Sequence, residues 1–467
     1  MSSHQPDPNI NVNLTIDGIP VTVPEGTRIL EAAKKVNINI PVLCEHPELC
    51  KRALCRICVV EFDGRPKLIT ACGNDVWEGV NIVTKNERLF YVRKTIIEMI
   101  LANHPQNCLS CVRSKSCELQ ILASQFGITT SSFTNEPDEI QPVVESETLV
   151  RDMSKCVKCN RCVEVCQETQ KIGAINTSRR GHEYEICTAF NQPLEDVKCV
   201  FCGGCASVCP VGAIYGHDQT KEVRKALGDS GIKTAAQVSD EIIPYLESEL
   251  RFVSTGKLLS TGKSPSNGQP LSVGQLVAAI KLLGFDKVYN AAVTVNVVNA
   301  EIIDEVQTRK KSGAKLPVIS GYAEGVTRFI NNFYPDLKEN LTSAKNLRQQ
   351  FAALIKADGA ITTVSFVSGI AQKYTASHAK TDFALTAAEL ARMIKTAGIV
   401  IEALPEEPFD VFDCEASKQS GKQPVGTFKK ETVHGYAQSR EVMESIQKGE
   451  CDAQWVEILD FIRKFDN

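Results

Sequence analysis

Apolar and polar residues alternate along residues 10–24, near the amino-terminal end of the chain. The alternation is centred on Asp17-Gly18, a dipeptide that suits the tight turn of a hairpin, so it predicts two antiparallel strands. After Glu25-Gly26 the apolar spacing becomes helical, which predicts a helix. The apolar face of this helix consists of Ile29, Ala32, Ala33 and Val36.

A second helical pattern stops at Asn103-His104-Pro105, a sequence that ends a helix. Its apolar face consists of Leu89, Val92, Ile96 and Ile100. From about residue 218 the chain has the pattern of ordinary α/β sequence. Residues 252–275 interrupt it with a stretch rich in Gly, Ser and Pro, which predicts a linker or a long surface loop.

Composition and charge give no support for a membrane-spanning, secreted or nucleic-acid-binding protein. The chain has 467 residues, 43% hydrophobic and 23% charged, which suggests about three domains at ~150 residues each. No apolar run approaches the ~20 residues of a membrane-spanning helix, and the first residues lack the basic and apolar regions of a secretory signal. We therefore expect a cytoplasmic protein. A net charge of −4, from 52 basic and 56 acidic residues, gives no support for nucleic-acid binding and favours protein partners.

The cysteines divide the chain into two chemically different halves. Seventeen of the 19 cysteines fall within residues 1–209. Without an export signal, closely spaced cysteines are more often metal ligands than disulfide partners. Their spacing therefore predicts which metal groups they bind.

The first cysteine set follows the predicted hairpin and helix, an order with which a β-grasp ferredoxin begins. Four thiolates at this spacing can hold a 2Fe-2S cluster, in which each iron takes two sulfur ligands. The predicted ligands are Cys44, Cys55, Cys58 and Cys72. Cys50 is the alternative to Cys44, because its spacing to Cys55 and Cys58 imitates that of plant ferredoxins. A zinc knuckle is the alternative to the cluster.

The second set combines one imidazole with three thiolates. Its predicted ligands are His104, Cys108, Cys111 and Cys117. These donors suit either a closed zinc site or a 4Fe-4S cluster. The position of the set, between a 2Fe-2S domain and further cysteine quartets, favours 4Fe-4S.

The third constellation is an internal repeat of C-x2-C-x2-C-x3-C, the signature of bacterial two-cluster ferredoxins. In that signature the fourth cysteine of each run binds the other cluster. One 4Fe-4S cluster is thus assigned to Cys156, Cys159, Cys162 and Cys209, and the other to Cys199, Cys202, Cys205 and Cys166. The cysteines left without a cluster are Cys50, Cys187, Cys414 and Cys451.

One 2Fe-2S and three 4Fe-4S clusters in series carry single electrons and perform no bond chemistry themselves. The order of these parts resembles the large iron-sulfur subunit of respiratory complex I and the catalytic subunit of iron-only (FeFe) hydrogenases. The ferredoxin pair favours the hydrogenases, and so do segments of the carboxyl half. Those segments are VRKALGD, AAIKLLGFDKVYN, LPVISGYAEGVTRFINNFYPDL, FAALIKADG and TDFALTAAELARMIKTAGI.

The resemblance implies an α+β multidomain fold. Residues 1–85 would form a β-grasp 2Fe-2S ferredoxin domain and residues 86–148 a 4Fe-4S domain with one histidine and three cysteine ligands. Residues 149–218 would form a bacterial two-cluster ferredoxin domain, and residues 219–467 a degenerate α/β hydrogenase-like domain. We expect the first half to keep its clusters without the second.

The resemblance also implies what the chain has lost. The hydrogenase family binds its active-site cluster through four cysteines, in TSC-x-PGW, MPC-x-x-K and E-x-MAC-x-x-GC segments. The residues at those positions are Tyr322, Gly369, Ser445 and Gly449, while Ala323 replaces a proton-relay cysteine and Gln372 a lysine. Glycine and tyrosine cannot replace thiolates toward soft iron. We therefore predict no catalytic residue and no hydrogenase activity, and a former cluster cavity that Tyr322 helps to fill.

A replacement active site has little support. No two glycines stand at positions i and i+2, so the Rossmann dinucleotide fingerprint is missing. Residues 256–264 imitate a phosphate-binding loop but have five residues between the glycines where the motif has four. No nucleotide-binding residue is predicted, and flavin chemistry is expected on another chain.

These features predict the electron-transfer subunit of a hetero-oligomeric, NAD(P)-linked, anaerobic oxidoreductase. The resemblance implies a flavin- and iron-sulfur-containing NADH-oxidising partner subunit, an NADP-binding flavoprotein subunit and ferredoxin, as in electron-bifurcating transhydrogenases of the Stn type. The alternative is the same role in a bifurcating nickel-iron hydrogenase or an NAD-dependent formate dehydrogenase complex. A redox sensor and an active iron-only hydrogenase are the remaining alternatives.

Overall fold

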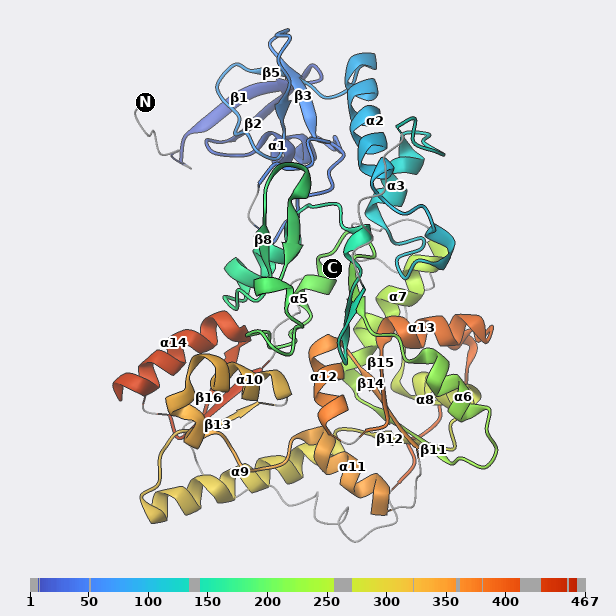
Figure 1. Ribbon diagram of the computed structural model, residues 1–467, viewed down its shortest axis with the longest axis vertical. Helices are drawn as coiled ribbons and strands as arrows, with labels where there is room; N and C mark the ends of the chain where they lie inside the picture. The colour runs from blue at the N-terminus through green and yellow to red at the C-terminus, as the bar shows by residue number, and fades with distance from the viewer. Residues whose placement is uncertain are drawn as a thin grey trace.

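The domains follow one another from the top to the bottom of the molecule in the computed structural model (Figure 1). The amino-terminal domains form the narrow upper part, and the carboxyl half forms two lobes side by side below them. The described residues are 7, 9–49, 52–133, 143–255, 271–321, 323–357, 362–379, 381–411, 430–451 and 453–459.

The first domain is a β-grasp fold with a five-stranded sheet in the order β2-β1-β5-β3-β4. The predicted hairpin is confirmed, with Ile16 opposite Ile19. Asp17 and Gly18 take the positive φ angles, 50° and 81°, that the tight turn needs. The predicted helix is confirmed as α1 and packs against the sheet. The elements are β1 (Asn11–Ile16), β2 (Ile19–Pro24), α1 (Ile29–Lys35), β3 (Val59–Phe62), β4 (Ile69–Thr70) and β5 (Asn81–Val83).

The second predicted helix is confirmed as α2 (Glu87–Ala102). The Asn86 side chain caps its start by accepting a hydrogen bond from the Leu89 backbone N–H at 2.8 Å. The helix ends at Ala102 with Asn103 as its C-cap, where the sequence predicts its stop. α3 (Glu118–Gln125) packs beside α2.

The following segment consists of short elements around buried cysteines. A three-stranded sheet in the order β10-β7-β6 and the hairpin β8-β9 surround its cysteine loops. A π-helical turn, Val165–Thr169, directly follows α4. The elements are β6 (Val144–Glu145), β7 (Leu149–Arg151), α4 (Arg161–Glu164), β8 (Asn176–Ser178), β9 (Glu185–Cys187), α5 (Gly204–Ser207) and β10 (Ile214–Gly216).

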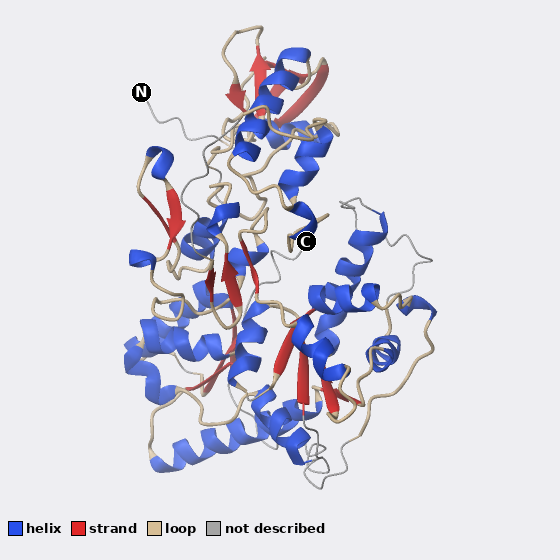
Figure 2. Ribbon diagram, turned by 45° about the vertical axis from the view of Figure 1, so that its right-hand side comes forward, coloured by secondary structure: helices blue, strands red, loops and turns tan. Residues whose placement is uncertain are grey.

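One lobe of the carboxyl half contains a parallel sheet in the order β12-β11-β14-β15. Figure 2 shows this sheet between helices. Its strands are almost wholly buried, as expected of a parallel sheet covered on both faces. The elements are α6 (Thr220–Leu227), β11 (Thr234–Val238), α7 (Ile243–Thr255), α8 (Val273–Leu282), β12 (Lys287–Asn290), α11 (Leu347–Ala357), β14 (Thr362–Val367), α12 (Ile370–His378), β15 (Phe383–Thr386) and α13 (Ala387–Thr396).

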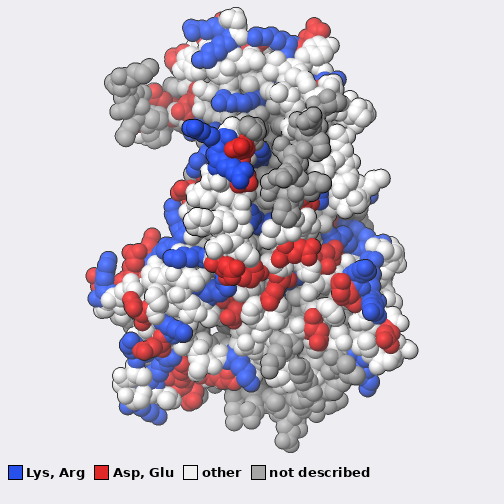
Figure 3. Space-filling model, viewed as in Figure 1, with Lys and Arg blue, Asp and Glu red and all other residues white. Residues whose placement is uncertain are grey.

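The other lobe contains the parallel sheet β13-β17-β16. Basic and acidic side chains are interspersed over the face of the molecule seen in Figure 3. No described helix has both the length and the apolar character needed to cross a membrane. The elements are α9 (Val293–Ser312), β13 (Val318–Gly321), α10 (Glu324–Phe333), β16 (Lys430–His434), α14 (Gly435–Lys448) and β17 (Trp455–Leu459).

The loop predicted over residues 252–275 is wrong at both ends. α7 continues to Thr255 and α8 begins at Val273. A capping box starts α8: the Ser272 hydroxyl accepts from the Gln275 backbone N–H at 3.1 Å, and the Gln275 side chain accepts from the Ser272 N–H at 3.2 Å. The S-x-x-Q signature was present in the sequence and is stronger evidence than the Gly- and Ser-rich composition around it. Residues 256–264, the loop that imitates a phosphate-binding motif, lie outside the described residues.

Candidate iron-sulfur centres and the cavity beyond them

The four cysteines predicted to hold the 2Fe-2S cluster converge beside the β-grasp core. The Cys58 sulfur lies 3.3 Å from the Cys72 sulfur, and the Cys55 backbone N–H donates to the Cys44 sulfur at 3.5 Å. Side-chain contacts of Cys44 with Cys55 and Cys72 join the two pairs into one group. Cys50, the alternative ligand, lies outside the described residues.

Contacts within this group divide its thiols into two kinds. Hydrogen bonds from Cys55 and Cys72 lower the pKa of Cys44 to about 2, and a hydrogen bond from Cys72 lowers the pKa of Cys58. The same contacts raise the pKa of Cys55 and of Cys72. Because iron binds thiolates, cluster assembly would displace the protons that the second pair retains. The donor set therefore fits a 2Fe-2S cluster.

In the second set, the His104 ring has a free nitrogen. Its Nδ1 is buried and has no hydrogen-bond partner in the described part of the chain, while the ring hydrogen-bonds to the backbone of Lys155. Burial lowers the pKa of His104, which favours the neutral imidazole. Burial also raises the pKa of Cys117, and the nearby charges of Cys111 and Cys108 add to that effect. A metal-binding histidine commonly uses its second nitrogen for such a backbone hydrogen bond, so these residues fit a metal centre.

The two ferredoxin runs fold with the same local geometry. In each run, a backbone N–H two residues after the first cysteine donates to that cysteine's sulfur at 3.4 Å. The pairs are Lys158 with Cys156 and Phe201 with Cys199. Lys158 and Phe201 also share a left-handed φ, 54° and 53°. The internal repeat seen in the sequence is thus a repeat in the backbone.

The fourth cysteine of each run lies close to the other run. Burial is the main cause of the raised pKa of the thiols in both groups, and the charge of this fourth cysteine adds to it. The thiols that respond to Cys209 are Cys156, Cys159 and Cys162. The thiols that respond to Cys166 are Cys199, Cys202 and Cys205. The structure therefore brings together the two groups in which the ferredoxin signature places the ligands.

Cluster ligands bind different irons, so they surround a volume larger than one ion. The sulfur-bearing residues of the first ferredoxin group line a small cavity. Within the described ranges, no three His, Cys, Asp or Glu side chains form a group that could hold a single metal ion.

Arg161 connects the loops that carry the predicted ligands. Its guanidinium donates to both carboxylate oxygens of Glu118, at 2.6 and 2.8 Å, and to the backbone carbonyl of Glu45 at 2.8 Å. Glu45 and Glu118 each directly follow a predicted ligand of a different cluster, and Arg161 directly precedes a ligand of a third. The side chain is 4% exposed. Sequence reasoning missed this residue, because its partners lie 43 and 116 positions away.

A second buried cation joins the ferredoxin segment to the carboxyl half. The Lys373 ammonium lies 2.7 and 2.9 Å from the two carboxylate oxygens of Glu389 and donates to the His217 carbonyl at 2.5 Å. Burial lowers the pKa of Lys373, and Glu389 opposes that shift. This pair fixes α12 against α13 and against the end of the ferredoxin segment.

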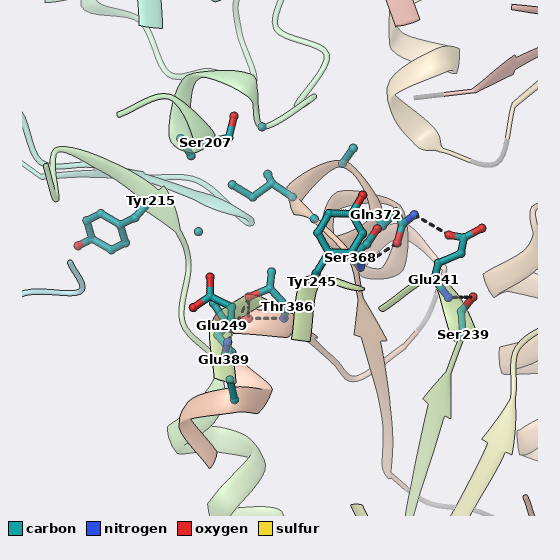
Figure 4. Close-up of a pocket in the computed structure, with 18 of the residues that line it drawn as sticks. Ser207, Tyr215, Ser239, Glu241, Tyr245, Glu249, Ser368, Gln372, Thr386 and Glu389 are labelled. Carbon is teal, nitrogen blue, oxygen red and sulfur yellow. Dashed lines mark hydrogen bonds between the residues drawn. The ribbon is translucent and has the colours of Figure 1, made fainter. Parts of the chain in front are cut away.

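Beyond the ferredoxin loops, a cavity of about 790 Å³ lies between them and the two lobes (Figure 4). Ala323 and Gly369 line it, and both occupy positions that are cysteines in the resembling family. Ser445 and Gly449 are not among the described residues that line the cavity. Ser445 lies in the last turn of α14, and Gly449 is the C-cap of that helix. Tyr322, expected to fill the cavity, lies outside the described residues. The expected filling by Tyr322 therefore stays a prediction.

Four family models match the chain in the predicted order. The 2Fe-2S iron-sulfur cluster binding domain matches residues 9–87, and the NADH-ubiquinone oxidoreductase-G iron-sulfur binding region matches residues 93–132. The ferredoxin-like domain of NADH-quinone oxidoreductase subunit 3 matches residues 146–215. The iron-only hydrogenase large subunit, C-terminal domain, matches residues 261–428. These matches confirm the predicted fold class, an iron-sulfur protein built on a hydrogenase-like domain.

One known protein aligns over most of the chain, and others align over less than half of it. It is 31% identical over 431 residues to the NADP-reducing hydrogenase subunit HndD of Solidesulfovibrio fructosivorans, a match that covers 85% of this chain and 71% of that relative. It is 35% identical over 208 residues to the NADPH-Fe(3+) oxidoreductase subunit alpha of Geobacter sulfurreducens, covering 44% of this chain but 24% of that relative. A solved NAD+-reducing NiFe-hydrogenase aligns with 44% of this chain and 87% of its own, at 31% identity and a TM-score of 0.41. The chain belongs to the iron-only hydrogenase family, as a degenerate member without the cysteine ligands of the active-site cluster.

Proposed function

We propose that the chain relays single electrons between a flavin-containing, NADH-oxidising partner subunit and a second redox site in an electron-bifurcating transhydrogenase that couples ferredoxin, NAD and NADP. Its cofactors would be one 2Fe-2S and three 4Fe-4S clusters, which supply one-electron steps at the sixteen donors assigned above. The observation that carries the proposal is a contrast within one chain. The predicted relay ligands are all present, while Gly369 and Ala323 leave the former active-site cavity without thiolates.

The chain's own residues would hold the clusters close together and shield them from water. Arg161 fixes three ligand-bearing loops against one another through Glu118 and the Glu45 carbonyl. In the two ferredoxin groups, Cys162, Cys205 and Cys209 are buried in an apolar core, and Cys156, Cys166 and Cys199 pack against it. A buried, rigid setting keeps the surroundings of a cluster from reorganising when its charge changes by one electron.

The names of two relatives support the proposed partners. NADP-reducing hydrogenase and NADPH-Fe(3+) oxidoreductase both pass electrons between a nicotinamide and another centre. This chain has neither the dinucleotide fingerprint nor hydrogenase ligands. A hydride acceptor and a second redox site would therefore be supplied by partner subunits, in the soluble interior of the cell.

The test compares the isolated chain with the complex purified anaerobically by a tag on this chain. NADH should reduce the clusters of the complex, seen by electron paramagnetic resonance, and should leave those of the isolated chain oxidised. Dithionite, which needs no flavin, is the control and should reduce both. Reduction of the isolated chain by NADH, or hydrogen evolution from it, would contradict the proposal. A nickel-iron or formate-oxidising subunit in the purified complex would replace the transhydrogenase with the alternative complex.

A further inference from the structure

The cavity of about 790 Å³ is large enough for a small molecule. Its lining comes from the ferredoxin loops through Gly203 and Ser207, from the end of β11 through Ser239, and from the start of α12 through Gly369. Figure 4 shows the Gln372 side chain between Ser368 and Glu241 at one side of this space. The chemistry of that side determines what the cavity can bind.

Arg348, near the start of α11, lines the cavity with an incompletely paired guanidinium. Its Nη2 donates to the Gln372 side-chain oxygen at 3.2 Å. In the described part of the chain, no carboxylate lies within 4.0 Å of this guanidinium and Gln372 is its hydrogen-bond acceptor. Burial lowers the pKa of Arg348 to about 10, a shift that Glu241 opposes, so the side chain is charged at neutral pH. Four of its five N–H donors remain for another group.

Three other charged groups of the lining have partners of their own. Arg392 lies 2.5 Å from Asp218, the Lys395 ammonium donates to the Glu249 carbonyl at 2.7 Å, and Glu389 pairs with Lys373. Glu241 accepts from the Gln372 side-chain nitrogen at 3.4 Å, so the amide separates it from Arg348. Arg348 thus has one neutral amide as its partner beside the start of α12, whereas Arg113 and Lys395, which also line the cavity, donate to backbone carbonyls.

The start of helix α12 adds a partial positive charge near the Arg348 guanidinium. Gly369 is the N-cap residue of α12 and offers no side-chain cap, and Gly369, Ile370 and Ala371 all line the cavity. The Gln372 oxygen that accepts from Arg348 also accepts from the Ser368 N–H at 3.1 Å, so the guanidinium lies one side chain away from this helix start. The first turn of a helix and a nearby arginine together favour an oxyanion.

We propose that this cavity binds a small molecule through a phosphate or carboxylate group, held by Arg348 and the first turn of α12. Anion binding does not rest on the proposed relay function, whereas its effect on the relay does. Its ligand would lie beside the loop that carries Gly203, next to the predicted ligand Cys202. A bound anion would therefore make the nearby cluster harder to reduce, and the cavity would act as a regulatory site on the relay.

The experiment measures binding of inorganic phosphate and of succinate to the anaerobic, cluster-loaded full chain by calorimetry at constant ionic strength. Saturable binding of phosphate identifies a phosphoryl ligand, and binding of succinate identifies a carboxylate. Arg348→Gln should weaken the affinity at least tenfold. Gln372→Glu should also weaken the affinity at least tenfold, because the new carboxylate pairs with Arg348 and competes with the ligand. This substitution keeps the size of the side chain. Arg88→Gln, which removes an equal charge from an exposed ion pair outside the cavity, should leave the affinity unchanged.

The two cavity variants protect the test from a folding failure. If Arg348→Gln does not retain its cluster absorbance, Gln372→Glu alone decides the outcome, since it preserves the arginine and the size of the side chain. Absence of saturable binding by both probes overturns the proposal. Binding that the folded variants leave unchanged also overturns it, because the anion would then lie elsewhere.

Discussion

At the residue scale, Arg161 connects loops that carry predicted ligands of three different clusters. A charge-assisted, bidentate hydrogen bond is among the strong ones, and Arg161 makes one to Glu118 as well as a bond to the Glu45 carbonyl. The Glu118 side chain is 40% exposed, so water can solvate its carboxylate when the arginine is removed. The arginine therefore matters more for the relative positions of the loops than for the stability of the whole chain.

Replacing Arg161 by glutamine should lower the free energy of unfolding of the ferredoxin segment by about 2 kcal/mol, the value of hydrogen bonds to a charged group. Anaerobic urea unfolding followed by cluster absorbance measures the change. Arg88→Gln removes an exposed pair with Glu61 and should change stability by less than about 0.5 kcal/mol. Equal effects of the two variants would show that Arg161 does not join the loops.

Substitution of single cysteines tests whether Cys44 or Cys50 is a ligand of the 2Fe-2S cluster. Cys44→Ser should abolish the 2Fe-2S signal in electron paramagnetic resonance, because Cys44 contacts Cys55 and Cys72 and serine is a poor ligand for soft iron. Cys50→Ser should leave the signal intact. The reverse pair of results would mean that the shorter, plant-type spacing supplies the ligands.

At the element scale, one glycine lies at a close contact between the ferredoxin segment and the hydrogenase-like domain. Gly203 has a φ of +79°, and a Cβ there would lie 2.7 Å from the Cβ of Ile370 at the start of α12. The cavity therefore meets the ferredoxin loops where only glycine fits.

Gly203→Ala should destabilise the protein by about 1–2 kcal/mol for the left-handed backbone, with about 1–3 kcal/mol more for the overlap with Ile370. Gly181→Ala is the matched control, since Gly181 has a φ of +64° and nothing within 4 Å of the added carbon. Thermal unfolding of both variants gives the difference. If they are equally destabilised, the two parts of the chain are not packed closely at this point.

Some elements could be predicted from the sequence because their determinants are local. The Asp17-Gly18 turn and the Asn103 stop depend on neighbouring residues, and the cysteine spacings describe loops of fixed length. The Ser272 capping box is equally local, although the Gly- and Ser-rich composition around it favours a loop. The position of Arg348 in a cavity could not be predicted, since it depends on how α11, α12 and β11 pack. The same holds for the pairing of Lys373 with Glu389.

At the scale of the whole molecule, hydrophobic cores cross the boundary predicted at residue 218. One core joins Phe201 of the ferredoxin loops to Tyr374 of α12, and their rings stack at 4.2 Å. Another core joins Val200 to Phe329 of α10. The sequence alone suggests that the first half keeps its clusters without the second, and these shared cores argue against that independence.

Deleting residues from about 220 onward should therefore expose Val200 and Phe201 and destabilise the 4Fe-4S cluster assigned to the Cys199 run. The 2Fe-2S cluster should survive, since its β-grasp core contains only residues of the first domain. Electron paramagnetic resonance of the truncated chain separates the two signals. A truncated chain with all its clusters, in a complex of normal turnover, would show that the hydrogenase-like domain is dispensable.

The content of iron and zinc in the anaerobically purified full chain tests the central claim most directly. The assignment of one 2Fe-2S and three 4Fe-4S clusters predicts about 14 irons per chain, with an equal amount of acid-labile sulfide and no stoichiometric zinc. About ten irons with one zinc would contradict the cluster at His104. Well over 14 irons would contradict the loss of the active-site cluster from the cavity.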